Sequence, residues 1–185
     1  MKYFFDILFL VALAYQAFPS AITLNSKEVT PPDRWMGVLI LALIQAVLYN
    51  FGGWLGERFM HLFVAHGPII VFAVLAFISF RLIQHALKIR KGTQLFSFHS
   101  LQHLSLLAVM TAFPAFFAGL IRPWFSPIDW YFSILLFVGS FIFAIVATKM
   151  RHNPYQILMA SFLQLAAAAL VILNAFFVLF SAYLM

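Results

Sequence analysis

Residues 13–20 read LAYQAFPS, and a related fragment, TAFPA, occupies residues 111–115. Each lies part-way along an apolar stretch and contains Ala-Phe-Pro, with Pro114 following Pro19 by 95 residues. Proline has no backbone N–H, so in a helix it leaves the carbonyl four residues earlier without its regular partner. The two fragments therefore predict helix breaks at Pro19 and Pro114, the first of them close to the amide of Gln16. The alternative is a kink that the helix tolerates, as is common in membrane helices.

A second pair of fragments has the same offset. PPDRW at residues 31–35 and SPIDW at 126–130 align Pro32 with Pro127 and Trp35 with Trp130, again 95 residues apart. Two echoes in one register indicate an internal repeat, with halves at about residues 1–92 and 93–185.

The composition is that of an integral membrane protein. Of 185 residues, 65% are hydrophobic and only 9% are charged, and the mean hydropathy is +1.02. A soluble domain of this size needs a more charged exterior. Cysteine is absent, which excludes disulfides and thiolate metal sites. The net charge of +6 predicts no nucleic-acid partner, because no basic run alternates with aromatic residues and loop charges commonly set membrane orientation.

Six apolar stretches are long enough to cross a bilayer, which requires about 20 helical residues. The polar, proline-rich or basic breaks NSKEVTPPDR, KIRKGTQ, RPWFSP and KMRHNP separate most of them, and no cleavage pattern follows the first. We therefore expect a single all-α domain over 1–185, embedded in the lipid bilayer. Its predicted spans are Phe4–Leu24, Trp35–Trp54, Leu62–Ala86, Leu101–Ile121, Ile128–Thr148 and Tyr155–Tyr183.

The distribution of Lys and Arg predicts the orientation. Basic residues near cytoplasmic span ends outnumber those on the other side in most multi-pass proteins. Three lie on one side, at Lys2, Arg58 and Arg122. The opposite side carries eight: Lys27, Arg34, Arg81, Lys88, Arg90, Lys91, Lys149 and Arg151. We expect the second group in the cytoplasm and both termini on the non-cytoplasmic side.

Three spans in each half mean that the second half enters the membrane from the opposite side. Such inverted repeats are common in secondary transporters, whose substrate site lies near the midplane between the halves. The 95-residue register pairs two sets of polar residues inside spans, Gln16 with Thr111 and Gln45 with Ser140. These four residues are our candidate substrate pathway. The alternative is that they only hydrogen-bond between helices.

Other residues suggest packing or metal binding. Gly52 and Gly56 form a G-x-x-x-G pair, typical of close helix packing. No carboxylate lies at mid-depth, since Asp6 is in the first turns of its span and the other four acids are in loops or at span ends. His99 and His103 have the i, i+4 spacing of a metal pair but lie at the membrane edge. They and Asp6 are weak metal candidates. We expect no cofactor and, without a nucleophile–base arrangement, no enzyme.

The chain resembles the manganese efflux pump (MntP-like) family of bacterial inner-membrane proteins, within the LysE-type superfamily of six-span exporters built from two three-helix repeats. LAYQAFPSAI is similar to the first-span motif of that family, and LIQAVLYNFGGWLG to its second-span pattern of Gln or Glu followed by glycines, here Gln45, Gly52 and Gly56. MTAFPAFFAG is similar to its fourth-span motif, and Arg81 falls near the basic position that ends the third span.

The resemblance implies a multi-pass exporter of the bacterial inner membrane, with a divalent cation or another small solute as its substrate. The chain departs from the family at the aspartates expected to bind the cation. Gln16 replaces the first, and Thr111 or Pro114 replaces the second. Loss of both acids also fits an alternative function, that of a transport-inactive relative serving as a membrane interaction or assembly protein.

Overall fold

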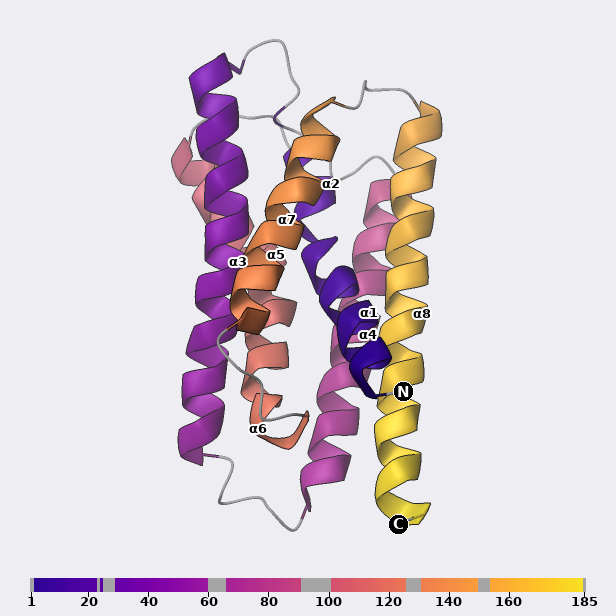
Figure 1. Cartoon of the computed structure of the whole chain (residues 1–185). Coiled ribbons are helices and arrows are strands. Elements are labelled where there is room, and N and C mark those ends of the chain that lie inside the picture. The colour runs from indigo at the N-terminus through magenta and orange to yellow at the C-terminus, as the bar shows by residue number, and fades with distance from the viewer. Residues whose placement is uncertain are drawn as a thin grey trace.

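The computed structural model in Figure 1 shows a helical bundle. The structure describes residues 2–22, 24, 29–59, 66–90, 101–125, 131–149 and 154–184. These residues contain no β-strand. The first predicted span consists of two helices, and a four-residue helix follows the fourth span. The helices are α1 (Lys2–Ala14), α2 (Ala17–Ile22), α3 (Pro31–Phe59), α4 (Gly67–Arg90), α5 (Leu101–Leu120), α6 (Arg122–Phe125), α7 (Tyr131–Lys149) and α8 (Pro154–Leu184).

Four helical segments are long and apolar enough to cross a membrane: α3, α4, α7 and residues Leu158–Phe180 of α8. This is the construction of a multi-pass membrane protein. The other two predicted spans correspond to shorter apolar segments, Ile7–Ile22 and Leu104–Leu120.

The start of α3 shows how the sequence sets a helix boundary. The Thr30 hydroxyl accepts a hydrogen bond from the backbone N–H of Asp33 (3.4 Å) and donates one to the Asp33 carboxylate (2.6 Å). This arrangement is a helix N-cap, and Pro31 occupies the first helical position, where its missing N–H is not needed. The helix then continues to Phe59, beyond the predicted span end at Trp54.

The chain runs along the bundle axis in alternating directions, as the colour gradient of α3, α4, α5, α7 and α8 shows in Figure 1. The most extensive pairs are α3 with α5 and α4 with α8. In the second pair, Ser79 donates a hydrogen bond to the Ala168 carbonyl and Ser161 to the Ala86 carbonyl, both at 2.9 Å. These two contacts run in opposite order along the helices, so α4 and α8 are antiparallel.

Small residues fill much of the interior, and large apolar residues cover much of the exterior. Sixteen of the buried hydrophobic residues are alanines, whereas Leu, Ile, Phe, Val and Met side chains dominate the exposed set. In lipid, burial of large apolar groups gives little driving force, and small residues allow helix backbones to approach closely. The interior is therefore that expected of a membrane bundle.

Glycines bring α3 and α5 into backbone contact. A Cβ atom on Gly52 would overlap the Phe116 carbonyl oxygen, and one on Gly56 would overlap that of Leu120. From the opposite side, a Cβ on Gly119 would overlap the Tyr49 carbonyl oxygen. This is the close helix contact that the G-x-x-x-G spacing predicts.

Candidate functional site

The first span is interrupted at Tyr15 and Gln16, which form a turn between α1 and α2. Because Pro19 has no N–H, the Tyr15 carbonyl cannot receive the regular i+4 helical bond. It accepts a hydrogen bond from the Phe18 N–H at 3.0 Å instead. The Gln16 N–H likewise reaches back only three residues, to the Leu13 carbonyl at 3.1 Å. The tighter turn displaces Gln16 from the helical path.

Pro114 has a different local structure from the one that the sequence predicts. α5 remains helical from Leu101 through Pro114 to Leu120. A proline removes one hydrogen bond, and a membrane helix tolerates that loss when neighbouring groups or small local adjustments compensate. The expected break at Pro114 is therefore absent, and the two prolines are not structurally equivalent.

Gln45 and Ser140 bridge helices around the end of α1. The Gln45 Nε2 donates a hydrogen bond to the Leu13 carbonyl at 3.2 Å, and the Ser140 hydroxyl donates to the Gln45 Oε1. In an uninterrupted helix the Leu13 carbonyl would accept from the N–H of Ala17. The break replaces that bond with the one from the Gln16 N–H, and the Gln45 amide donates a second hydrogen bond to the same carbonyl. Both side chains are buried, so this half of the predicted pathway links α1, α3 and α7.

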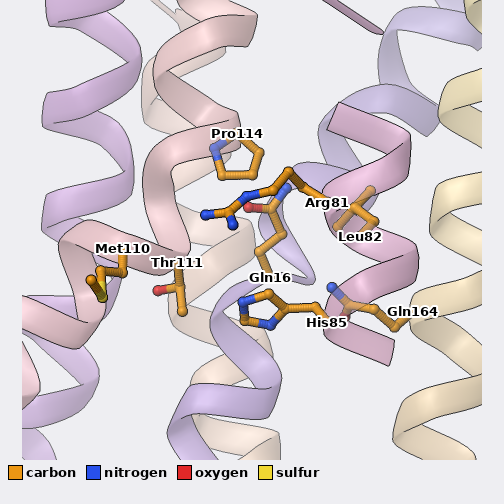
Figure 2. A pocket seen from close by; sticks show the side chains of 8 residues that line it. All are labelled: Gln16, Arg81, Leu82, His85, Met110, Thr111, Pro114 and Gln164. Carbon is orange, nitrogen blue, oxygen red and sulfur yellow. The ribbon is translucent and has the colours of Figure 1, made fainter. Parts of the chain in front are cut away.

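Gln16 and Thr111, the other half of the predicted pathway, line one pocket. Figure 2 shows it between the α1–α2 turn, α4, α5 and α8. Its cavity volume is about 10 Å³. That is room for about one water molecule. The lining residues are Gln16, Arg81, Leu82, His85, Met110, Thr111, Pro114 and Gln164.

Several buried polar atoms at this pocket have no hydrogen-bond partner. Gln16 is 4% exposed, and neither its Oε1 nor its Nε2 is bonded. Gln164 is 1% exposed, and its Oε1 is also unbonded. Thr111 donates to the Ala108 carbonyl of its own helix at 3.1 Å. An unsatisfied buried polar group costs about 1–3 kcal/mol, so such groups are rare unless they serve a ligand or water.

The pocket is also positively charged. Figure 2 shows the Arg81 side chain extending from α4 toward the Pro114 and Thr111 side, while the Gln16 amide points into the same space. His85 lies one helical turn beyond Arg81 and lines the pocket as well. None of the described lining residues is acidic. The carboxylates whose side chains the structure describes lie elsewhere, Asp33 at Thr30 and Glu57 at 3.6 Å from Arg122.

Three polar lining residues were not predicted from the sequence as part of the site. Arg81 contributed only to the charge count and the family motif, and His85 and Gln164 received no role in the pathway. The spacing of Arg81 and His85 places them on one face of α4, inside an apolar helix. An ionisable residue within a span is a functional candidate by default. Gln164, an amide well inside α8, gives the same signal more weakly.

The weak metal candidates fall outside the part of the chain whose side chains are described. His99 lies between the described segments, and Asp6 and His103 are helical residues of which only the backbone is described. Within the described residues, no group of three His, Cys, Asp or Glu side chains could hold a metal ion.

Comparison of the chain with protein-family models, with curated proteins and with solved structures gives no match. Any functional proposal must therefore come from the site itself, with the manganese-exporter resemblance as a hypothesis.

Proposed function

We propose that this protein is a small-solute exporter of the bacterial inner membrane, with its substrate site in the Gln16 pocket. The observation that carries the proposal is the set of unbonded polar atoms of Gln16 and Gln164, buried in a pocket between four helical segments. The structural amide of Gln45, by contrast, bonds to its neighbours. A transport site instead keeps its polar atoms available for the solute.

An inverted repeat forms part of this proposal, and the helix contacts support it. A two-fold axis relating residues 1–92 to 93–185 would exchange α1–α2 with α5, α3 with α7 and α4 with α8. The axis would then convert the contact between α3 and α5 into the contact of α7 with α1 and α2. It would likewise convert the contact between α1 and α8 into the contact between α5 and α4. All of these contacts occur.

The polar pairs support the same axis. A residue can touch its own symmetry mate only near a two-fold axis. Gln45 accepts a hydrogen bond from Ser140, its mate in the 95-residue register. Gln16 and Thr111, the second predicted pair, line one pocket. In this proposal the shorter segments Ile7–Ile22 and Leu104–Leu120 complete six spans, and the pocket lies where the two halves meet.

The lining does not favour manganese as the cargo. A bare divalent cation of this kind prefers anionic oxygen ligands, usually carboxylates. Gln16, Thr111 and Gln164 offer only neutral oxygens, and Arg81 adds a repelling charge. A solute exporter that resembles the manganese family in architecture, with a different cargo, fits the pocket better.

A second candidate function is that of a transport-inactive membrane assembly protein. It is favoured by the small free space in the pocket, which admits about one water molecule and no larger solute. In the transporter proposal the same observation describes an occluded state, one of the conformations through which alternating access passes.

A proteoliposome efflux assay separates the two functions. Vesicles are loaded with a defined mixture of small cationic, neutral, zwitterionic and anionic solutes, and efflux of each is followed by mass spectrometry. We expect protein-dependent loss of at least one solute, reduced about tenfold or more by Gln16→Met. Gln84→Met, the same change at a residue of α4 that does not line the pocket, should leave efflux unchanged. Absence of all efflux from folded, reconstituted protein would favour the assembly function.

Manganese is tested separately in an exporter-null strain that is sensitive to this metal. The unmodified chain should not rescue growth, because its pocket lacks an acid among the described residues. Gln16→Asp supplies a carboxylate at the position where the resembled family has one. Rescue by the unmodified chain would refute the argument against manganese, and rescue by Gln16→Asp alone would indicate that only the acid is missing.

A further inference from the structure

The position of Arg81 points to the charge of the cargo. Arg81 lies within α4, nine residues before Arg90 at the end of the helix, or about 13 Å along the helix axis at 1.5 Å per residue. A guanidinium is charged at all physiological pH values, and within a span it needs a counter-charge or water. No described carboxylate lies at the pocket. Among the described residues, therefore, no carboxylate balances Arg81, and the pocket beside it is open to a bound anion or to water.

We infer that the pocket binds a small organic anion, a 2-hydroxy monocarboxylate such as glycolate or lactate, through its carboxylate on Arg81. This inference rests on the proposed transport function and specifies its substrate. The planar guanidinium matches a carboxylate with two parallel hydrogen bonds. One carboxylate also balances one arginine, whereas a phosphate dianion would leave an excess negative charge in a buried site.

The unbonded amide atoms account for the hydroxyl group. Gln16 offers one donor, its Nε2, which can bond to the carboxylate or the hydroxyl oxygen. The Oε1 atoms of Gln16 and Gln164 are acceptors, so they require a donor on the solute. A hydroxyl supplies that donor without adding a positive charge next to Arg81. An ammonium group would be repelled there, which favours a hydroxy acid over a zwitterion.

The pocket has to widen even for a solute of two or three carbon atoms, because its free space admits about one water molecule. The present free space is that of an occluded state, so binding must widen the pocket. Gln16 lies in the turn between α1 and α2, where regular helical hydrogen bonding is already interrupted. Movement of α2 relative to α1 would widen the pocket without breaking an intact helix.

Binding to the purified protein in lipid nanodiscs tests this inference. Sodium glycolate is titrated by calorimetry at constant ionic strength, against acetate, glycine, glycolamide, inorganic phosphate and manganese chloride. We expect glycolate to bind at least tenfold more tightly than each of the others. Acetate lacks the hydroxyl, glycolamide lacks the charge, and glycine carries an ammonium.

Variants of Arg81 connect the binding to the pocket. Arg81→Gln should weaken glycolate binding at least tenfold, and Arg81→Lys should weaken it less, because it keeps the charge but loses the planar fork. Arg90→Gln removes the same charge from an exposed position on the same helix and should leave binding unchanged. If Arg81→Gln does not fold, Gln16→Met takes its place and should reduce the preference for glycolate over acetate.

The outcomes separate this inference from the proposed function. Preferential transport of a cation, a zwitterion or a neutral solute in the proteoliposome assay would overturn the anion inference and leave the transporter proposal standing. Glycolate binding that is equal in the unmodified protein and Arg81→Gln would also overturn it. Failure of every solute to move or bind would overturn both.

Discussion

The two buried glutamines of the first half should respond in opposite ways to the same substitution. Methionine has nearly the length and flexibility of glutamine but lacks its amide. Gln45→Met removes the hydrogen bond to the Leu13 carbonyl and the one from Ser140. Gln16→Met removes no hydrogen bond, because neither of its amide atoms has a partner. We therefore expect destabilisation from the first change and none from the second.

The structure sets the magnitudes. A hydrogen bond between membrane helices contributes on average about 0.6 kcal/mol, and a buried group left without a partner costs about 1–3 kcal/mol. Gln45→Met loses two bonds and strands the Ser140 hydroxyl, so the expected loss is about 1–3 kcal/mol. At about 2–4 °C per kcal/mol for a chain of this size, the melting temperature falls by about 5 °C. Gln16→Met should raise the melting temperature or leave it unchanged, because the substitution removes two buried polar atoms that have no hydrogen-bond partner.

The measurement is thermal unfolding of each variant in the same lipid nanodiscs, with Gln84→Met as the control for the substitution itself. A double variant of Gln45→Met with Ser140→Ala adds a further check. Because the two side chains share a bond, the second change should cost less in the double variant than alone. Equal destabilisation by Gln16→Met and Gln45→Met would refute the reasoning, since it would mean that the Gln16 amide is bonded in the folded protein.

Three further predictions concern packing and topology. Gly119→Ala should separate α5 from α3 and lower the melting temperature strongly. Gly53→Ala should be tolerated, because its Cβ first meets the flexible Arg122 side chain at 3.3 Å and lies at an ordinary contact distance, 3.8 Å, from the Gly119 carbonyl oxygen. Equal melting temperatures of the two variants would contradict the backbone contact. Tyr15→Phe removes the 3.0 Å bond from its hydroxyl to the Ala160 carbonyl and should cost about 0.6 kcal/mol in the same assay, and a loss several times larger would show another role for the hydroxyl. Because the chain has no cysteine, Glu57→Cys and Arg90→Cys can each be labelled alone with an impermeant maleimide. We expect Glu57→Cys to react with label added from the periplasm and Arg90→Cys with label added from the cytoplasm. Labelling of both variants from the same side would refute the orientation.

The sequence predicted the helices well because length and apolarity determine them. The predicted span Leu101–Ile121 ends within one residue of α5, and Tyr155–Tyr183 lies within α8. The aromatic residues at the ends of the second span, Trp35 and Trp54, are exposed as an aromatic belt requires. The break in the first span was also predicted, since a proline necessarily leaves one carbonyl without its regular partner.

The roles of the polar residues could not be predicted in the same way. Gln16 and Gln45 look alike in the sequence, each an amide inside an apolar span. Which of them finds a partner depends on the distance between helices, and the sequence does not contain that distance. Pro114 illustrates the same limit, because whether a proline breaks a helix or sits within it depends on the neighbours that stabilise the helix.

The proposed two-fold axis explains why the two predicted pairs have different roles. Residues on such an axis meet their own mates, so Gln45 and Ser140 can satisfy each other and become structural. Residues displaced from the axis need not touch their mates. Gln16 and Thr111 face a common pocket, and the Gln16 amide remains unbonded. One repeat can thus generate both a link between the halves and a site between them.

In the proposed 95-residue register, the pocket is one-sided. Its charged and basic groups, Arg81 and His85, correspond to Phe176 and Phe180 in the second half, both exposed on the outside of the bundle. A perfectly symmetric protein would carry two equivalent charged sites, one on each side of the midplane. Here the positive charge is confined to one, in the half of α4 nearer its basic end. Under the proposed function, an anion would therefore meet a single binding site, placed toward the predicted cytoplasmic face, the side from which the proposed exporter would take its cargo.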